Sequence, residues 1–188
     1  FSVQQKKPTC KISFKKGDGY CSDLIWIGDY ILAICPEGAL YCVSAKEETL
    51  SINWRLDIPK KFTKMGLSPF QRYRLVLFDK EHSFFLIYLP MNLTKADYKT
   101  EIIKLSNNEL IKDIQFAEHF PETLFILFDF ELLVYNTELK CARKIVRQQK
   151  TSSSFMGLMQ NSTDHRILRV FTKNGGMATY SLQGDLKG

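Results

Sequence analysis

Apolar runs of strand length recur along the chain at a nearly constant interval. They begin at four positions that are 43, 50 and 43 residues apart, namely Tyr30, Tyr73, Thr123 and Arg166. A short turn follows each run, and then comes a second predicted strand, at Ala39–Val43, Ser83–Leu89, Leu132–Asn136 and Gly176–Leu182. A strand-based repeat of this length is typical of the blades of a β-propeller. We therefore predict an all-β fold, a partial β-propeller of about four blades, each a four-stranded antiparallel sheet.

The third repeat shows the strand pattern best. Polar and apolar side chains alternate with a period of two in Ile111–Ala117, whereas Leu124–Phe128 is a continuous apolar run. Alternation indicates a strand with one buried face, and a continuous run indicates a strand that is covered on both faces. Read in the same way, residues 1–188 form one propeller segment with blades at 21–57, 62–106, 111–148 and 154–184.

The two ends of the sequence differ from the regular repeat. Residues 10–16 are predicted as the outer strand of a preceding blade, and no outer strand is expected after Gly184 in the fourth blade. Propellers usually need more than four blades to close, and the chain begins at Phe1 rather than at Met. We expect a segment of a larger protein, or a chain that completes its sheet with another chain. An unpaired blade edge predicts dimerisation through that edge.

Composition is compatible with this fold. The 188 residues are 45% hydrophobic and 13% aromatic, enough for a single packed core. Lysine and arginine number 26 against 20 acidic residues, which gives a net charge of +6. Such a charge suits acidic partners, and it also serves solubility alone. The aromatic residues fall inside apolar strands rather than beside basic residues, which argues against nucleic acid as a ligand.

One local cluster of positive charge stands out on the predicted outer strand of the third blade, comprising Lys140, Arg143, Lys144, Arg147 and Lys150. Strict alternation would place Arg143 and Arg147 on one face of the strand and Lys144 on the other. The cluster is a candidate contact for acidic protein motifs through charge-assisted hydrogen bonds. The alternative is a charged edge strand that resists unwanted pairing.

The residue types that carry chemistry are sparse. His82, His119 and His165 each lie in or beside a predicted turn, where solvated polar residues are the rule. The five cysteines show no C-x-x-C spacing, so neither a zinc site nor a disulfide framework is expected. Cys35 and Cys42 could face each other across a hairpin, although reduced, buried thiols are the expected state. We predict a protein that is not an enzyme and needs no cofactor or metal.

The dipeptides near the strand ends carry a family resemblance. The chain lacks the Gly-His and Trp-Asp dipeptides of WD repeats and has Trp54-Arg55, Tyr135-Asn136 and Tyr180-Ser181 near the comparable positions, so it resembles a degenerate WD-repeat propeller. Over about residues 50–183 it also resembles the WD repeat-containing protein 11 family, on the segments Asn53-Trp54, Ser68-Pro69-Phe70, Asp113–Phe116, Leu124–Phe128, Glu131–Asn136, Phe155–Leu158 and Lys173–Gly176. That family has a long polar insertion about where Met91–Tyr98 stands here, and its members are much longer proteins with two propellers.

The resemblance implies a large, non-catalytic scaffold for protein interactions. Proteins of that family act in vesicle tethering and protein transport at the trans-Golgi network, where they help golgins to capture carriers through a TBC-domain adaptor. It implies other subunits of a large complex as partners, and a cytoplasmic location with peripheral association at Golgi or vesicle membranes, since no apolar run approaches the ~20 residues of a membrane span. Two alternatives stay open: a propeller segment of a nuclear pore or coat assembly, and a basic nucleic-acid-binding module.

Overall fold

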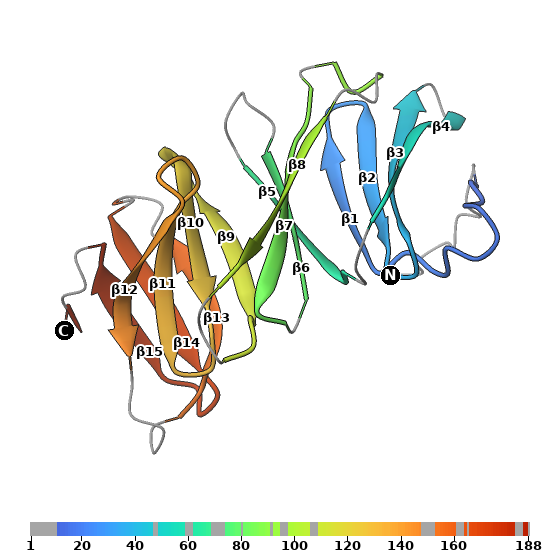
Figure 1. Ribbon diagram of the computed structural model, residues 1–188. Coiled ribbons are helices and arrows are strands. Elements are labelled where there is room, and N and C mark those ends of the chain that lie inside the picture. Colours follow the sequence, from blue (N-terminus) through green and yellow to red (C-terminus); the bar gives the residue numbers. More distant parts are fainter. Residues whose placement is uncertain are drawn as a thin grey trace, which may run out of the picture. The chain divides into compact units, whose positions relative to one another are not determined.

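The computed structural model describes residues 11–46, 49–58, 62–68, 74–79, 81–90, 92–94, 98–105, 109–147, 153–160, 164, 166–182 and 186–187. Within these residues the regular elements are sixteen β-strands, and none of them is a helix (Figure 1). The strands form four antiparallel sheets of four strands each, and neighbours in the chain are neighbours in each sheet. The predicted all-β partial propeller of four-stranded blades is thereby confirmed.

The four sheets follow one another in chain order. Sheet 1 contains β1 (Asp23–Ile27), β2 (Tyr30–Cys35), β3 (Ala39–Lys46) and β4 (Thr49–Asp57). Sheet 2 contains β5 (Lys64–Leu67), β6 (Arg74–Phe78), β7 (Ser83–Tyr88) and β8 (Lys99–Lys104). Sheet 3 contains β9 (Asp113–Ala117), β10 (Phe120–Leu127), β11 (Glu131–Asn136) and β12 (Cys141–Arg147). Sheet 4 contains β13 (Phe155–Gln160), β14 (Ile167–Thr172), β15 (Met177–Ser181) and β16 (Leu186–Lys187).

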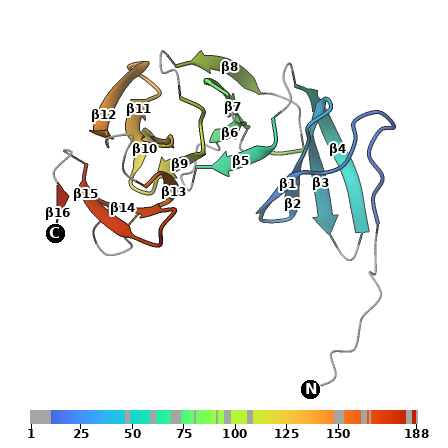
Figure 2. The ribbon, with the colours of Figure 1, turned by 90° about the horizontal axis from the view of Figure 1, so that it is seen from below.

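The chain divides into two compact units. Unit 1 spans Phe1–Lys64 together with Asn92–Asp97 and contains sheet 1, whereas unit 2 spans Met65–Met91 and Tyr98–Gly188 and contains sheets 2, 3 and 4. In unit 2 the three sheets stack face to face, and β9 contacts both β6 and β13. Figure 2 shows the strands β5, β9 and β13 gathered toward the middle of this unit, with the later strands of each sheet farther out.

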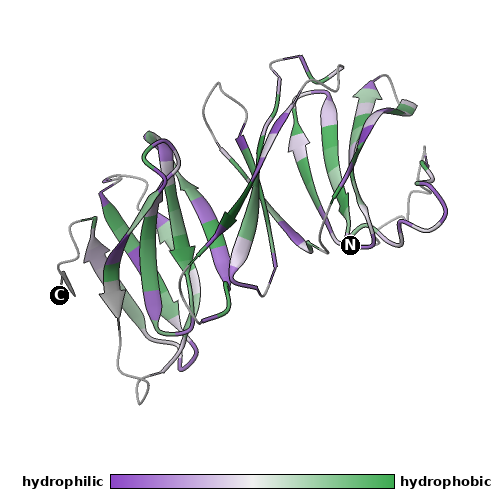
Figure 3. Cartoon of the chain, viewed as in Figure 1, coloured by the Kyte–Doolittle hydropathy of each residue, from purple (hydrophilic) through white to green (hydrophobic). Residues whose placement is uncertain are grey.

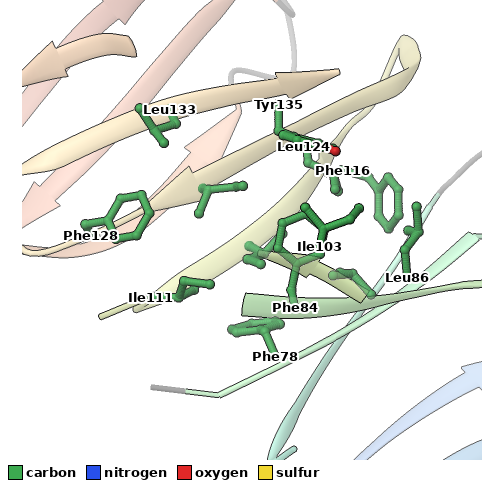
Figure 4. Close-up of a cluster of buried hydrophobic side chains, with 13 residues drawn as sticks. Phe78, Phe84, Leu86, Ile103, Ile111, Phe116, Leu124, Phe128, Leu133 and Tyr135 are labelled. Carbon is green, nitrogen blue, oxygen red and sulfur yellow. The ribbon is translucent and has the colours of Figure 1, made fainter. Parts of the chain in front are cut away.

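Two apolar cores hold unit 2 together. The first lies between sheets 2 and 3, where Phe78, Phe84 and Leu86 meet Phe116, Leu124 and Tyr135 (Figure 4). The second lies between sheets 3 and 4, where Phe125, Leu127 and Leu132 meet Phe155, Leu158 and Val170. Both faces of sheet 3 are therefore buried, which explains the continuous apolar run in β10. The hydropathy colouring shows the same apolar strand centres (Figure 3).

Direct hydrogen bonds also join sheets 3 and 4. Lys112 Nζ donates to the carbonyl oxygen of Phe155 at 2.6 Å, and Gln115 Nε2 donates to that of Leu158 at 2.8 Å. The side-chain oxygen of Gln160 accepts the backbone N–H of Glu118 at 2.7 Å. In each of these bonds one partner is a backbone atom, which has little freedom to move. The bonds therefore fix β13 against β9 and the residues that flank it.

The strands β5 and β9 approach each other closely at Gly66. A Cβ atom on this residue would lie 3.0 Å from Val76 Cγ1 and 3.2 Å from the backbone oxygen of Ile114. The first neighbour lies in the same sheet, but the second belongs to the backbone of sheet 3, which has little freedom to move. Glycine is the residue that allows this approach.

The segment before β1 corrects one prediction. Residues 11–16 were expected to belong to an outer strand, but the described residues before β1 form no strand. Ile12 and Phe14 instead pack on a face of sheet 1 that includes Ala33, Tyr41 and Val43. The Phe14 and Tyr41 rings lie 4.4 Å apart between centroids, and stacking of this kind buries apolar area without strand pairing.

The far end of the chain corrects another prediction. Sheet 4 does have an outer strand, β16, in which Leu186 and Lys187 pair with Tyr180 and Thr179. With only two residues, this strand gives no periodic signal in the sequence, because a period of two needs at least four residues to be visible.

Candidate interaction surface

The predicted basic cluster lies on and beside β12, the edge strand of sheet 3. Three of its side chains form ion pairs or hydrogen bonds with other residues of the same chain. Lys140 Nζ lies 2.6 Å from Glu101 Oε1, and this hydrogen bond raises the pKa of the Lys140 ammonium above its ordinary value. Lys144 Nζ lies 2.9 Å from Oε1 of the buried Glu131. The guanidinium of Arg143 donates to the carbonyl oxygen of Leu182.

The arrangement of the cluster differs from strict alternation. A β-bulge interrupts the pairing of β11 with β12, since Leu132 pairs with Val146 but Leu133 pairs with Lys144. This extra residue lies between Arg143 and Arg147 along the strand, and the prediction that their side chains share one face stays a prediction. Arg147 is the backbone partner of Glu131. Lys150 lies outside the described residues, and the use of the cluster as an acidic-partner contact stays a prediction.

The turn between β11 and β12 presents an apolar side chain in a fixed geometry. Asn136 Oδ1 accepts the backbone N–H groups of Glu138 and Leu139 at 3.0 and 2.7 Å, and Lys140 takes a left-handed conformation with φ of 53°. The Leu139 side chain is 75% exposed. Because hydrogen bonds already fix the backbone of this turn, the turn loses less conformational entropy when a partner covers Leu139. Periodicity did not reveal this residue, although an Asn at the end of a strand signals such a turn.

The charged side chains that are buried serve structural contacts. The carboxylate of Asp18 accepts hydrogen bonds from Arg55 and from the Tyr41 hydroxyl, and these bonds lower its pKa to about 2. Arg74 forms an ion pair with Glu122 and donates to Thr137 Oγ1 at 3.0 Å. Both carboxylates are therefore held in networks that join separate segments of the chain.

The described histidines lie at or beside turns, and the described residues that could bind a metal do not cluster. His82 Nδ1 lies 3.0 Å from the carbonyl oxygen of Glu109 on the surface. His119 lies in the turn between β9 and β10, and His165 falls outside the described residues. Across the described ranges, no three His, Cys, Asp or Glu side chains lie together as a metal site requires. The same ranges contain no helix long and apolar enough to cross a membrane.

Four cysteines are described, and all of them are free thiols. Cys35 pairs with Ala39 across the hairpin and Cys42 pairs with Leu32, so the two cysteines do not face each other, and both are buried, free thiols as expected. They lie on opposite faces of sheet 1, because residues 39 and 42 are an odd number of positions apart. Burial raises the pKa of each of these thiols to about 11, which keeps both protonated near neutral pH.

Exposed apolar side chains on two of the sheets are a feature that the sequence did not reveal. On sheet 4 they include Met159, Phe171 and Met177, and on sheet 1 they include Leu24 and Trp26. Large apolar patches on a surface often mark places where other molecules bind. The strands themselves are readable from the sequence, but the sequence does not say which of their faces lacks a neighbouring sheet.

Comparisons with known proteins bear on the fold alone. No protein-family model matches the chain, and no curated protein matches it. Among solved structures, it is similar to the β-propeller domain of Cps50 (Swd1) from Myceliophteria thermophila, with 16% sequence identity and a TM-score of 0.67. The match covers 84% of this chain and 50% of that domain, so the chain spans about half of the propeller it resembles. Together with the four antiparallel sheets, this identifies the fold as a partial β-propeller.

Proposed function

We propose that this chain is a non-catalytic scaffold segment that binds other proteins through the surface around the turn at Leu139. The observation that carries the proposal is the fixed geometry of this turn. Asn136 holds the two backbone N–H groups before Lys140, and the exposed Leu139 side chain projects from the turn. An apolar anchor in a preorganised loop is the kind of residue that dominates binding energy at protein interfaces.

The surroundings of Leu139 supply the polar border that an interface anchor needs. Lys140 follows Leu139 in the chain, and its ion pair with Glu101 on β8 lies beside the turn. Charged groups at the margin of an apolar contact contribute orientation and association rate more than affinity. A partner would therefore cover Leu139 and meet one positive and one negative side chain at its edge.

The finer proposal is a role in vesicle tethering and protein transport at the trans-Golgi network. It rests on the sequence resemblance over about residues 50–183 to the WD repeat-containing protein 11 family. On this proposal the chain is cytoplasmic, associates with Golgi or vesicle membranes peripherally, and binds other subunits of a large complex. The partial propeller fold supports a binding role in general and is equally compatible with the nuclear pore or coat alternative.

Affinity purification with quantitative mass spectrometry tests both the binding role of Leu139 and the role at the trans-Golgi network. The tagged chain is compared with Leu139→Asp, which removes the anchor, and with Leu110→Asp as a matched control at another exposed leucine. The proposal expects golgins, a TBC-domain adaptor or other large tethering subunits to be enriched by the original chain and by the control, and lost with Leu139→Asp. Enrichment of nuclear pore or coat subunits would overturn the Golgi assignment. Partners retained by Leu139→Asp would overturn the role of the turn.

A further inference from the structure

The turn that presents Leu139 begins with a buried threonine that is held from outside the turn. Thr137 is 3% exposed, and its backbone N–H donates to the carbonyl oxygen of Glu122 at 2.8 Å. Its hydroxyl oxygen accepts a hydrogen bond from Arg74 Nη1 at 3.0 Å. Arg74 belongs to β6 of sheet 2, whereas Thr137 follows β11 of sheet 3. A side chain of sheet 2 therefore holds the first residue of the turn.

The other end of the turn is also bound to sheet 2. Lys140 Nζ lies 2.6 Å from Oε1 of Glu101, a residue of β8. Alternation along β8 places Glu101 on the same face as Ile103, which is buried in the core between sheets 2 and 3. The carboxylate therefore faces sheet 3. Its side chain is 29% exposed, so salt screens this ion pair less than it would screen a fully exposed one.

The backbone of the turn needs such support. Lys140 has a φ of 53°, a left-handed conformation that costs free energy in residues other than glycine. The N–H groups of Glu138 and Leu139 both donate to the Asn136 side chain, which closes the turn on itself. The bond from Lys140 to Glu101 helps to offset the cost of the left-handed residue.

We infer that Arg74 and Glu101 are positioning residues for this turn, so that two side chains of sheet 2 hold the segment of sheet 3 that presents Leu139 to a partner. The inference rests on the proposed function at Leu139 and deepens it, because the binding surface then depends on two neighbouring sheets rather than on one loop. By linkage, a partner that binds the positioned turn should also stabilise the packing of sheet 2 on sheet 3.

Loss of positioning should weaken binding through conformational entropy. A turn that samples several conformations has to be ordered when a partner binds, and this ordering lowers the affinity. A partly exposed ion pair contributes little to global stability, so Glu101→Gln should loosen the turn and leave the rest of the protein folded. This difference separates a positioning role from a purely structural one.

Amide hydrogen exchange followed by nuclear magnetic resonance tests the positioning without any partner. Glu101→Gln should raise the exchange rates of the Glu138 and Leu139 amides about two- to five-fold, the range that a partly exposed ion pair supports. Thr137→Val removes the acceptor of the Arg74 hydrogen bond and should act in the same direction. Circular dichroism checks that each variant is folded.

Two further variants show whether the charge pair itself is responsible. Asp129→Asn is the matched control, because it removes an ion pair with Lys112 at the other end of β11 and should leave the turn amides unchanged. The double variant Glu101→Lys/Lys140→Glu exchanges the two charges and should restore slow exchange in the turn. A role of Glu101 that depends only on its shape would not give this recovery.

Affinity purification with quantitative mass spectrometry supplies the second reading. The partners that Leu139→Asp loses should be captured about two- to five-fold less by Glu101→Gln and recovered by the charge-exchanged double variant. Unchanged turn exchange in Glu101→Gln, undiminished capture by that variant, or no recovery in the double variant would overturn the inference even if Leu139→Asp loses its partners. Partners retained by Leu139→Asp would overturn the proposed function itself, and with it any binding role of the positioned turn.

Discussion

The guanidinium of Arg55 in β4 binds both carboxylate oxygens of Asp18, with Nε 2.8 Å from Oδ2 and Nη2 2.9 Å from Oδ1. The side chain of Asp18 is only 9% exposed, and the hydroxyl of Tyr41 in β3 donates to the same carboxylate. The Tyr41 oxygen in turn accepts the backbone N–H of Lys15 at 3.0 Å. This network therefore fastens the segment before β1 to the third and fourth strands of sheet 1.

The first prediction concerns the pH dependence of stability. The hydrogen bonds from Arg55 and Tyr41 lower the pKa of Asp18 from 3.8 to about 2 in the folded protein. A lowered pKa stabilises the folded state at pH values above the unfolded pKa, and this contribution disappears as the pH falls from about 4 to about 2. Asp18→Asn should reduce the free energy of unfolding by about 1–2 kcal/mol at pH 7 and by much less near pH 2. Urea denaturation at both pH values measures the difference.

Asp57→Asn is the matched control for this prediction. Asp57 also pairs with Arg55, but its side chain is 87% exposed, and exposed ion pairs contribute little. Its loss should change stability far less than the loss of Asp18. Equal effects of the two substitutions, or an Asp18→Asn effect that is the same at both pH values, would contradict a stabilising role for the buried carboxylate.

The second prediction concerns the close approach at Gly66. Gly66→Ala places a methyl group 3.2 Å from the backbone oxygen of Ile114 and should cost about 1–3 kcal/mol of unfolding free energy. Gly157→Ala is the control, because a Cβ there meets nothing within 4 Å, and this change should be close to neutral. Thermal denaturation followed by circular dichroism compares the two. A neutral Gly66→Ala variant would mean that β5 and β9 lie farther apart.

The third prediction concerns the ion pair between Arg74 and Glu122. Arg74 is buried, its guanidinium carbon lies 5.4 Å from the Tyr88 ring centre, and it also binds Thr137. Arg74→Met should cost about 3–5 kcal/mol because it leaves the Glu122 carboxylate without its charge partner. The double variant Arg74→Met/Glu122→Gln should be more stable than the sum of the two single effects implies. Simple additivity in urea titrations would show that the two side chains do not interact.

The fourth prediction concerns the hydrogen bonds between sheets 3 and 4. Gln115→Ala removes the donor to the Leu158 carbonyl, so we expect faster amide hydrogen exchange in β13 and β14. Exchange in β6 and β7 should stay unchanged, because sheet 2 packs on the other face of sheet 3. Mass spectrometry of peptides from the two regions provides both readings. A uniform increase across unit 2 would indicate global destabilisation instead.

The strands of this fold could be predicted from the sequence because their apolar content is high and local. The run Leu124–Phe128 and the alternation in Ile111–Ala117 each report on a strand through its own residues. β16 was missed because two residues carry no period. Residues 10–16 were predicted as an outer strand, yet Ile12 and Phe14 pack on sheet 1, and residues 11–16 form no strand.

The surfaces were much harder to predict than the strands. Phe78 and Phe171 occupy corresponding positions with similar chemistry, but one is buried and the other exposed, and only the presence of a neighbouring sheet decides which. The basic cluster could be recognised in the sequence as a group of charges. Its partners could not, because Glu101 lies on β8 of sheet 2 and Glu131 on β11 of sheet 3. The bulge in β12 likewise has no sequence signature of its own.

A map of side-chain contacts by nuclear Overhauser spectroscopy tests the stacking of separate sheets in unit 2. We predict cross-peaks between the rings of Phe84 and Tyr135, which lie 5.5 Å apart between centroids although they belong to different sheets. We also predict that backbone protons of β12 and β13 show no cross-strand contacts, because each sheet ends where the next begins. Missing Phe84–Tyr135 contacts, or backbone pairing that runs continuously from β12 to β13, would contradict a stack of separate four-stranded sheets.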